Sequence, residues 1–211
     1  MYPAGNIFVP VAHGRLEAIL KEPRDGKARG VALVLHPHPL GGGTMHNKVV
    51  FRAASALNDV GLTTLRINFR GVGQSSGQHD EGRGELQDVR DGLTHLATNY
   101  PGSPITLCGF SFGARVGLEV GISEPRVVNL ISIGTPVDKY DFEFLLACRK
   151  SILFVHGDHD EFGDLTRLQH LVEQLEGKTD VTTKIIRGAD HFFAGHLDEL
   201  KQAITEWMAK H

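Results

Sequence analysis

Short apolar runs alternate with longer amphipathic segments along almost the whole chain. Several of the runs are hydrophobic at nearly every position, which is typical of strands buried on both faces. The segments between them place apolar residues three and four positions apart, which is typical of helices with one buried face. We predict strands over residues 30–35, 62–69, 105–110, 127–133, 152–156 and 181–186, and helices over residues 45–60, 85–100, 112–122, 162–175 and 197–208.

The first two apolar segments are arranged differently from the rest. Residues 7–11 and 16–20 are joined by His13-Gly14, a spacing that predicts a hairpin and therefore an antiparallel edge. The whole pattern predicts an α/β fold with a mostly parallel central sheet, this N-terminal antiparallel hairpin, and helices on both faces. Because no linker or internal repeat interrupts the pattern, we expect a single domain over residues 1–211.

Composition narrows the class of protein. Of the 211 residues, 41% are hydrophobic and 22% charged, as in ordinary globular proteins. The net charge of −3 gives no reason to expect nucleic acid or an anionic membrane as a partner. The chain shows no apolar stretch long enough for a membrane span, and its first residues lack the pattern of a signal peptide. With two cysteines and no paired cysteine motif, we expect a cytoplasmic protein.

The run G-F-S-F-G joins a predicted buried strand to a predicted helix of small residues. A serine at such a sharp strand-to-helix turn stands above the edge of the sheet, and Gly109 and Gly113 are required where a Cβ would meet backbone. The positive end of the helix then faces the serine, and the N–H of Phe112 can donate to an oxyanion. We therefore predict that Ser111 is a nucleophile and Phe112 an oxyanion donor.

A serine hydroxyl needs a base to take its proton, and the base needs an orienting acid. With this kind of turn the chain order is serine, acid, histidine. The strand over residues 152–156 ends in H-G-D-H-D, which offers Asp158 or Asp160 as the acid. The last strand leads into R-G-A-D-H-F-F, which offers His191 as the base, whereas His196 is expected to begin the final helix. Because carboxyl ends of parallel strands share one edge, these groups should meet.

Three histidines in these strand-end segments have a second possible interpretation, as metal ligands. His156, His159 and His191 lie near aspartates, but they form no H-E-x-x-H or comparable ligand spacing. We therefore expect no metal and no cofactor.

Five motifs together carry a resemblance that extends over most of the chain. They are H-P-H-P-L-G-G-G (36–43), R-I-N-F-R-G-V-G-Q-S-S-G (66–77), G-F-S-F-G (109–113), H-G-D-H-D (156–160) and G-A-D-H-F-F (188–193). With them the chain resembles the α/β-hydrolase superfamily, above all compact bacterial serine hydrolases related to dienelactone hydrolases and to peptidases of the prolyl-oligopeptidase type.

The resemblance implies further site residues. It selects Asp160 as the acid, because the family's acid falls four residues after the histidine of H-G-x-x-D. It also implies a second oxyanion donor in the loop after the strand over residues 30–35. Pro37 and Pro39 have no N–H to donate, so the donor is His38, which we favour, or Leu40.

The interval between residues 133 and 152 is too short for the cap domain that many relatives carry. It holds one predicted short helix over residues 142–148, so we expect no cap domain and an open site. An open site admits water and a small-molecule acyl substrate, which favours hydrolysis over acyl transfer. Candidates for the substrate pocket are Leu40, Phe110, Phe142 and Phe192.

These inferences predict a serine hydrolase that cleaves carboxylic ester-like bonds through an acyl-enzyme, a carboxylesterase in the broad sense. A serine peptidase or amidase of the same fold is the alternative, followed by a non-catalytic binding member, since fold alone does not fix function. The sequence leaves open the acyl length and the oligomeric state, a homodimer included.

Overall fold

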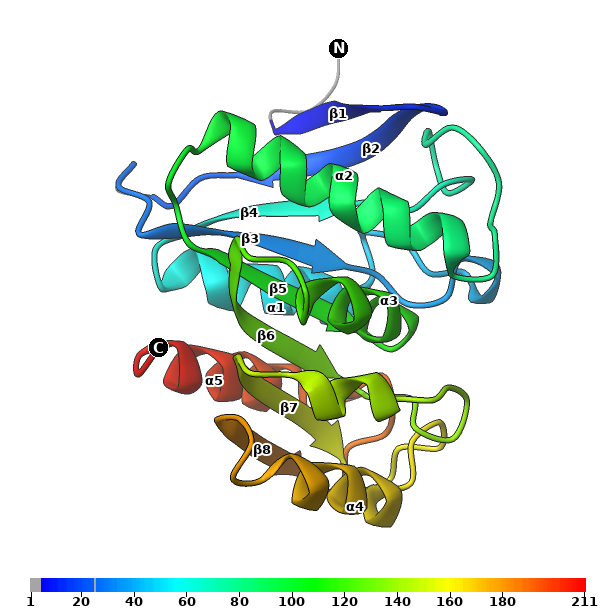
Figure 1. Ribbon diagram of the computed structural model, residues 1–211, viewed down its shortest axis with the longest axis vertical. Helices are drawn as coiled ribbons and strands as arrows, with labels where there is room; N and C mark the ends of the chain where they lie inside the picture. The colour runs from blue at the N-terminus through cyan, green and yellow to red at the C-terminus, as the bar shows by residue number, and fades with distance from the viewer. Residues whose placement is uncertain (1–4, 25) are drawn as a thin grey trace.

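The computed structural model describes residues 5–24 and 26–211; residues 1–4, which begin the leading segment considered above, lie outside the described residues. The described residues form one sheet in the order β1-β2-β4-β3-β5-β6-β7-β8 (Figure 1). The strands are β1 Asn6–Val11, β2 Gly14–Lys21, β3 Gly30–Leu35, β4 Leu62–Ile67, β5 Ile105–Phe110, β6 Val127–Ile133, β7 Ser151–Gly157 and β8 Val181–Ile186. The α-helices are α1 Lys48–Asp59, α2 Arg83–Asn99, α3 Phe112–Gly121, α4 Leu165–Leu175 and α5 Leu197–Met208.

Strand direction follows the prediction. β1 and β2 form the antiparallel hairpin, β2 runs antiparallel to β4, and every neighbouring pair from β4 to β8 is parallel. The fold class of a mostly parallel sheet with an N-terminal antiparallel hairpin is therefore confirmed. Its hairpin buries Val9 opposite Leu16, which anchors the edge of the sheet to the core.

Both faces of the sheet are covered by helices. Helices α2, α3 and α4 lie on one face and α1 and α5 on the other (Figure 1). The strand β3 shows why, because it is buried at every position and its side chains alternate between the two faces. Val31, Leu33 and Leu35 join the core under α2 and α3, whereas Ala32 and Val34 join the core under α1 and α5.

Two predicted helices begin later than their apolar periodicity indicates. The helix expected over residues 45–60 begins at Lys48, because Asn47 precedes it and its side chain accepts the N–H of Val49. The helix expected over residues 162–175 begins at Leu165, where Asp164 caps the N-terminus. The short helix expected over residues 142–148 is the 3₁₀-helix η2, Glu143–Ala147.

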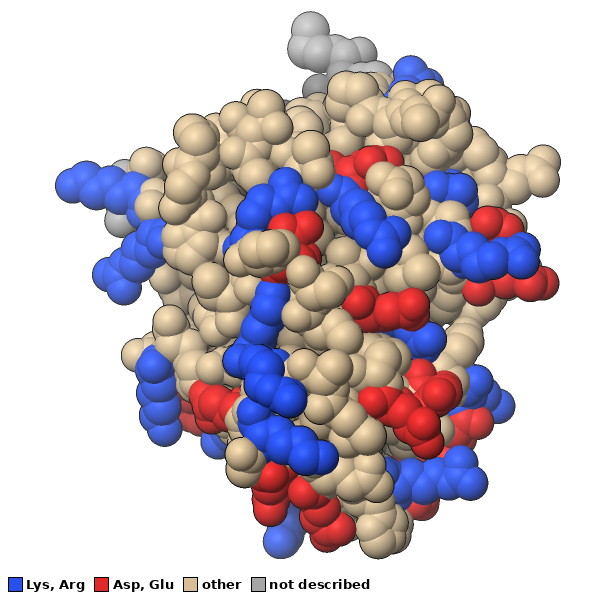
Figure 2. All heavy atoms as spheres, in the orientation of Figure 1, with Lys and Arg blue, Asp and Glu red and all other residues tan. Residues whose placement is uncertain are grey.

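Nothing larger than η2 stands between β6 and β7 in the described chain, so no cap domain covers the carboxyl edge of the sheet. Within the described residues, no helix combines the length and the apolar character needed to cross a membrane. The face in Figure 2 carries acidic and basic side chains intermixed rather than a field of one sign.

The strand order reverses around β3, since β4 follows it in sequence on one side and β5 lies on the other. Loops leaving β3 and β5 therefore diverge at a topological switch point, where open α/β sheets bind ligands. The loop after β3 contains the 3₁₀-helix η1, Pro39–Gly41, and the turn after β5 contains Ser111.

Candidate active site

Ser111 occupies the strained turn between β5 and α3. Its backbone has φ 56° and ψ −119°, a conformation that costs a non-glycine residue of order 1–3 kcal/mol and persists where the surroundings fix it. The N–H of Ser111 donates to the carbonyl of Ile133 at 2.9 Å. A Cβ on Gly109 would lie 2.3 Å from the Gly113 carbonyl oxygen, and one on Gly113 would lie 2.6 Å from the His36 carbonyl oxygen. Only glycine fits both positions of this turn.

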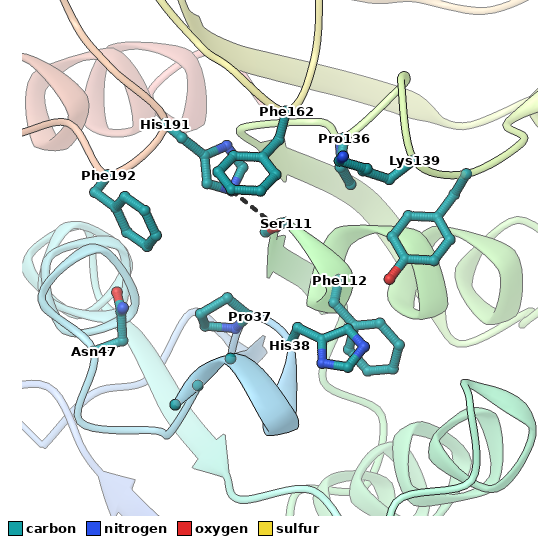
Figure 3. Close-up of a pocket in the computed structure, with 14 residues that line it drawn as sticks. Pro37, His38, Asn47, Ser111, Phe112, Pro136, Lys139, Phe162, His191 and Phe192 are labelled. Atoms are coloured by element: carbon teal, nitrogen blue, oxygen red, sulfur yellow. Dashed lines mark hydrogen bonds between the residues drawn. The ribbon is translucent and has the colours of Figure 1, made fainter.

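Three side chains that follow three different strands form a hydrogen-bonded chain. His191 Nε2 is 2.9 Å from Ser111 Oγ, and His191 Nδ1 is 2.8 Å and 2.9 Å from the two carboxylate oxygens of Asp160 (Figure 3). His191 is 2% exposed, and the Asp160 side chain is fully buried. Because an ionised carboxylate only accepts, Nδ1 carries the proton and Nε2 is left to accept the serine hydroxyl.

Asp160 is oriented by the backbone that follows it. Its Oδ1 accepts the N–H of Phe162 at 2.8 Å and that of Gly163 at 3.1 Å. Because the side chain of Asp160 takes up these two N–H groups, the segment does not enter α4 until Leu165. The other candidate acid, Asp158, accepts the N–H of Gly188 at 2.6 Å and makes no contact with His191. Of the two aspartates, the structure brings only Asp160 to the histidine.

Aromatic rings hold the imidazole of His191 in place. The centroid of the Phe162 ring lies 4.6 Å from that of His191, and the buried ring of Phe110 lies 5.0 Å from it. His196, the rival histidine, stands at the N-terminus of α5, and its Nδ1 pairs with Glu199 at 2.7 Å. It takes no part in the hydrogen-bonded chain of Ser111, His191 and Asp160.

Two of the three histidines considered as metal ligands, His156 and His191, have other partners. The buried His156 donates from Nε2 to the carbonyl of Gly163 at 2.7 Å, and burial lowers its pKa. His191 is engaged at both ring nitrogens, as described above. Across residues 5–24 and 26–211, no group of three or more His, Cys, Asp or Glu side chains is arranged to hold a metal ion.

The three backbone N–H groups considered as oxyanion donors differ in what they already bind. Leu40 donates its N–H to His38 Nδ1 at 3.2 Å, as part of the N-terminus of η1. The N–H groups of His38 and Phe112 have no hydrogen-bond acceptor within the described part of the chain. His38 and Phe112 therefore have donors free for a substrate oxygen, and Leu40 does not.

His36 fixes the loop that carries His38. It is fully buried, its Nδ1 lies 2.6 Å from the Pro37 carbonyl, and its Nε2 accepts the N–H of Phe69 at 3.0 Å. Accepting at Nε2 requires the neutral ring, and burial lowers the pKa of His36 to about 4. The neutral imidazole thus ties the end of β3 to the residues after β4. Sequence reasoning missed this role, for which H-P-H-P is the only signal.

A cavity of about 480 Å³ opens in front of Ser111. Its walls combine aromatic and proline side chains with several polar side chains and a run of three glycines. The lining residues are Pro37, His38, Gly41, Gly42, Gly43, Asn47, Ser111, Phe112, Pro136, Lys139, Tyr140, Phe162, His191 and Phe192. We call this space the serine cavity.

Of the four pocket candidates named from the sequence, only Phe192 lines the serine cavity. Leu40 is 78% exposed, because η1 turns its side chain to solvent. Phe110 is buried beneath His191 and Phe192, since it ends a strand that is buried throughout. Phe142 is buried against Phe144, away from the serine.

Several lining residues carried no sequence signal. Pro136, Lys139 and Tyr140 come from the loop after β6, and Phe162 from the loop after β7. Burial raises the pKa of Tyr140, so its hydroxyl stays protonated near neutral pH. The sequence pattern does not assign Pro136, Lys139 or Tyr140 to an element, it places Phe162 in a helix, and only the tertiary structure brings these residues to the serine.

Comparison with known proteins agrees with this geometry. Residues 30–208 match the family model described as alpha/beta hydrolase domain. The chain is 41% identical over 185 residues to the uncharacterized protein RP471 of Rickettsia prowazekii, covering 84% of this chain and 78% of that protein.

Two solved structures share the whole architecture. An alpha-beta serine hydrolase homologue from Coxiella burnetii superposes with a TM-score of 0.89 at 34% identity, covering 99% of each chain. XC6422 from Xanthomonas campestris, an α/β serine hydrolase without a lid, superposes with a TM-score of 0.88 at 32% identity, covering 100% of this chain and 96% of that one. The protein is thus a serine hydrolase homologue without a lid, and the chain belongs to the alpha/beta hydrolase family.

Proposed function

We propose that the protein is a carboxylesterase acting on small-molecule acyl esters. The observation that carries this proposal is the hydrogen-bonded series Ser111–His191–Asp160 at the wall of an uncovered aromatic cavity. A hydroxyl beside an unprotonated imidazole nitrogen is an activated nucleophile, and the buried carboxylate stabilises the imidazolium that forms.

The chemistry proceeds in two stages. Ser111 Oγ attacks the ester carbonyl while His191 Nε2 takes the hydroxyl proton, and the N–H groups of Phe112 and His38 donate to the oxyanion. His191 then gives the proton to the departing alkoxide, which leaves an acyl group on Ser111. Water, deprotonated by His191 Nε2, attacks the acyl carbon; the bond to Ser111 Oγ breaks, Oγ takes the proton back from His191, and the acid is released. The aromatic walls favour an apolar acyl or alcohol group, and the uncovered rim gives water access.

The first experiment is covalent labelling with a fluorophosphonate, with turnover of p-nitrophenyl acetate measured in parallel. The wild-type protein should label and turn over the ester, and Ser111→Ala should lose both. Ser123→Ala is the matched control. Ser123 follows α3, and its hydroxyl donates to the carbonyl of Val120 within that helix. It should retain both. Absence of labelling and of ester turnover in the folded wild-type protein would contradict the proposal.

Two further measurements separate the alternatives. Turnover should persist in excess chelator, because no metal takes part in the proposed steps. The corresponding anilide, p-nitroacetanilide, should turn over far more slowly than the ester. If the anilide were the better substrate, the protein would be an amidase or peptidase instead.

A further inference from the structure

A second hollow adjoins the serine cavity. It has a volume of about 550 Å³ and is lined by Gly42, Thr44, His46, Asn47, Lys48, Val49, Phe192, Ala194, Gly195 and Leu197. Its walls come from the segment leading into α1 and from the loop before α5. The mechanism proposed above makes no use of this space.

The two spaces adjoin one another and share part of their walls. Gly42, Asn47 and Phe192 line both of them. In Figure 3, Phe192 and Asn47 stand together on one side of Ser111, opposite Lys139 and Phe112. The second hollow therefore lies on the Phe192 side of an ester whose carbonyl is at Ser111.

Phe192 is held at this boundary by its neighbours. Its ring lies edge-on to His191 at 5.2 Å and edge-on to the buried Phe110 at 6.0 Å, measured between ring centroids. The next residue, Phe193, is fully buried with φ 54°, a left-handed conformation that sends its ring into the core. With Phe193 anchored inward, Phe192 is left 48% exposed between the two spaces.

The loop that presents Phe192 is also braced from within. Asp190 accepts the N–H of Phe193 at its carbonyl, at 3.1 Å, and the N–H of Ala194 at its side chain, at 2.9 Å. Phe192 therefore presents half of its apolar side chain, from a braced loop, at the wall that both spaces share beside Ser111.

We infer that the second hollow is an extended substrate subsite, and that Phe192 separates it from the serine cavity and sets how long an ester arm the site accepts. The inference rests on the proposed esterase function. The occupant is the distal, apolar part of the same substrate's longer arm, because the hollow adjoins the serine cavity and its lining includes the apolar Val49, Ala194 and Leu197. The physiological substrate class is then an ester with an extended or bulky apolar arm rather than an acetate.

The test compares chain-length profiles in two ester series. One series varies the acyl chain of p-nitrophenyl esters from two to twelve carbons, and the other varies the alcohol of alkyl acetates, followed by pH-stat. Each protein is described by its own ratio of kcat/KM for long and short esters, so that a general loss of activity cancels.

Two variants should move this ratio in opposite directions. Phe192→Ala joins the two spaces and should shift the optimum of one series to longer chains, with a gain of up to about fourfold for each additional buried methylene. Ala194→Trp fills the second hollow with a bulky ring and should lower the ratio. Phe51→Ala is the matched control, since Phe51 is 54% exposed on α1 and lines neither space. It should leave the profile unchanged.

The outcomes are distinguishable. If the wild-type protein turns over no ester of either series, the proposed function fails. If it turns over short esters but neither variant alters either profile, the subsite inference alone is overturned. If Ala194→Trp changes the sedimentation behaviour and leaves both profiles intact, the hollow is a contact between copies of the chain, and the inference is again overturned.

Discussion

The geometry around Asp160 makes a sharp prediction for Asp160→Asn. The two carboxylate oxygens lie 2.9 Å and 2.8 Å from His191 Nδ1, and Oδ1 also accepts the N–H groups of Phe162 and Gly163. An asparagine keeps those two backbone bonds only if its oxygen replaces Oδ1. Its NH₂ group then takes the position of Oδ2. Because this group is a hydrogen-bond donor, it disfavours a proton on the Nδ1 that it faces.

The expected consequence is a change of tautomer. With a donor facing Nδ1, the imidazole proton moves to Nε2, which can no longer accept from the Ser111 hydroxyl. A triad of this kind loses roughly 10⁴ in kcat on this substitution. Because the remaining amide oxygen still lies within reach of Nδ1, we expect a loss of about 10³ to 10⁴ in kcat, or about 4 to 5.5 kcal/mol in the activation free energy.

The assay is kcat/KM for p-nitrophenyl acetate, with thermal unfolding to show that the variant is folded. Asp158→Asn is the matched control, because its oxygen can still accept the N–H of Gly188 and it makes no contact with the histidine. We expect it to lose less than about threefold. If Asp158→Asn were impaired as severely as Asp160→Asn, or if Asp160→Asn kept more than a tenth of the activity, the assignment of the acid would be refuted.

Two further predictions concern stability. Burial holds the pKa of His36 at about 4 in the folded protein, against about 6.5 unfolded, so the unfolded chain gains a proton first as pH falls. The free energy of unfolding is therefore undiminished above pH 6.5 and decreases between pH 6.5 and 4 by up to about 3 kcal/mol. Urea titrations of wild type and His36→Gln across that range should show a shallower decrease in the variant; equal slopes would contradict the argument. In Gly113→Ala, the added Cβ would lie 2.6 Å and 2.7 Å from the carbonyl oxygens of His36 and Leu35, which are backbone atoms. We expect a loss of about 1–3 kcal/mol in stability, seen as a lower Tm, together with lower esterase activity; an unchanged Tm would show that the turn can relax.

Periodicity determined most of the architecture because each strand and helix has a local pattern of burial. The strands over residues 105–110, 127–133 and 181–186 and the helix over residues 197–208 have the bounds that the sequence predicts. The predicted starts of two helices were less accurate. The side chains of Asn47 and Asp160 accept backbone N–H groups near these starts, and the spacing of apolar residues gives no sign of such hydrogen bonds.

The chain order of serine, acid and histidine could likewise be taken from the sequence, because parallel strands deliver their carboxyl ends to one edge. The choice between Asp158 and Asp160 could not be made from spacing, and it needed the resemblance. In the structure, the hydrogen bonds of each carboxylate distinguish the two.

Only the tertiary structure decided the shape of the site. Phe110 and Phe142, taken as pocket residues, are buried, whereas Phe162 and Tyr140 line the serine cavity from separate loops. A strand or helix repeats its pattern locally, so a short stretch of sequence reveals which face is buried. A cavity wall is built from single residues of distant loops, and their positions depend on how the packed sheet brings those loops together.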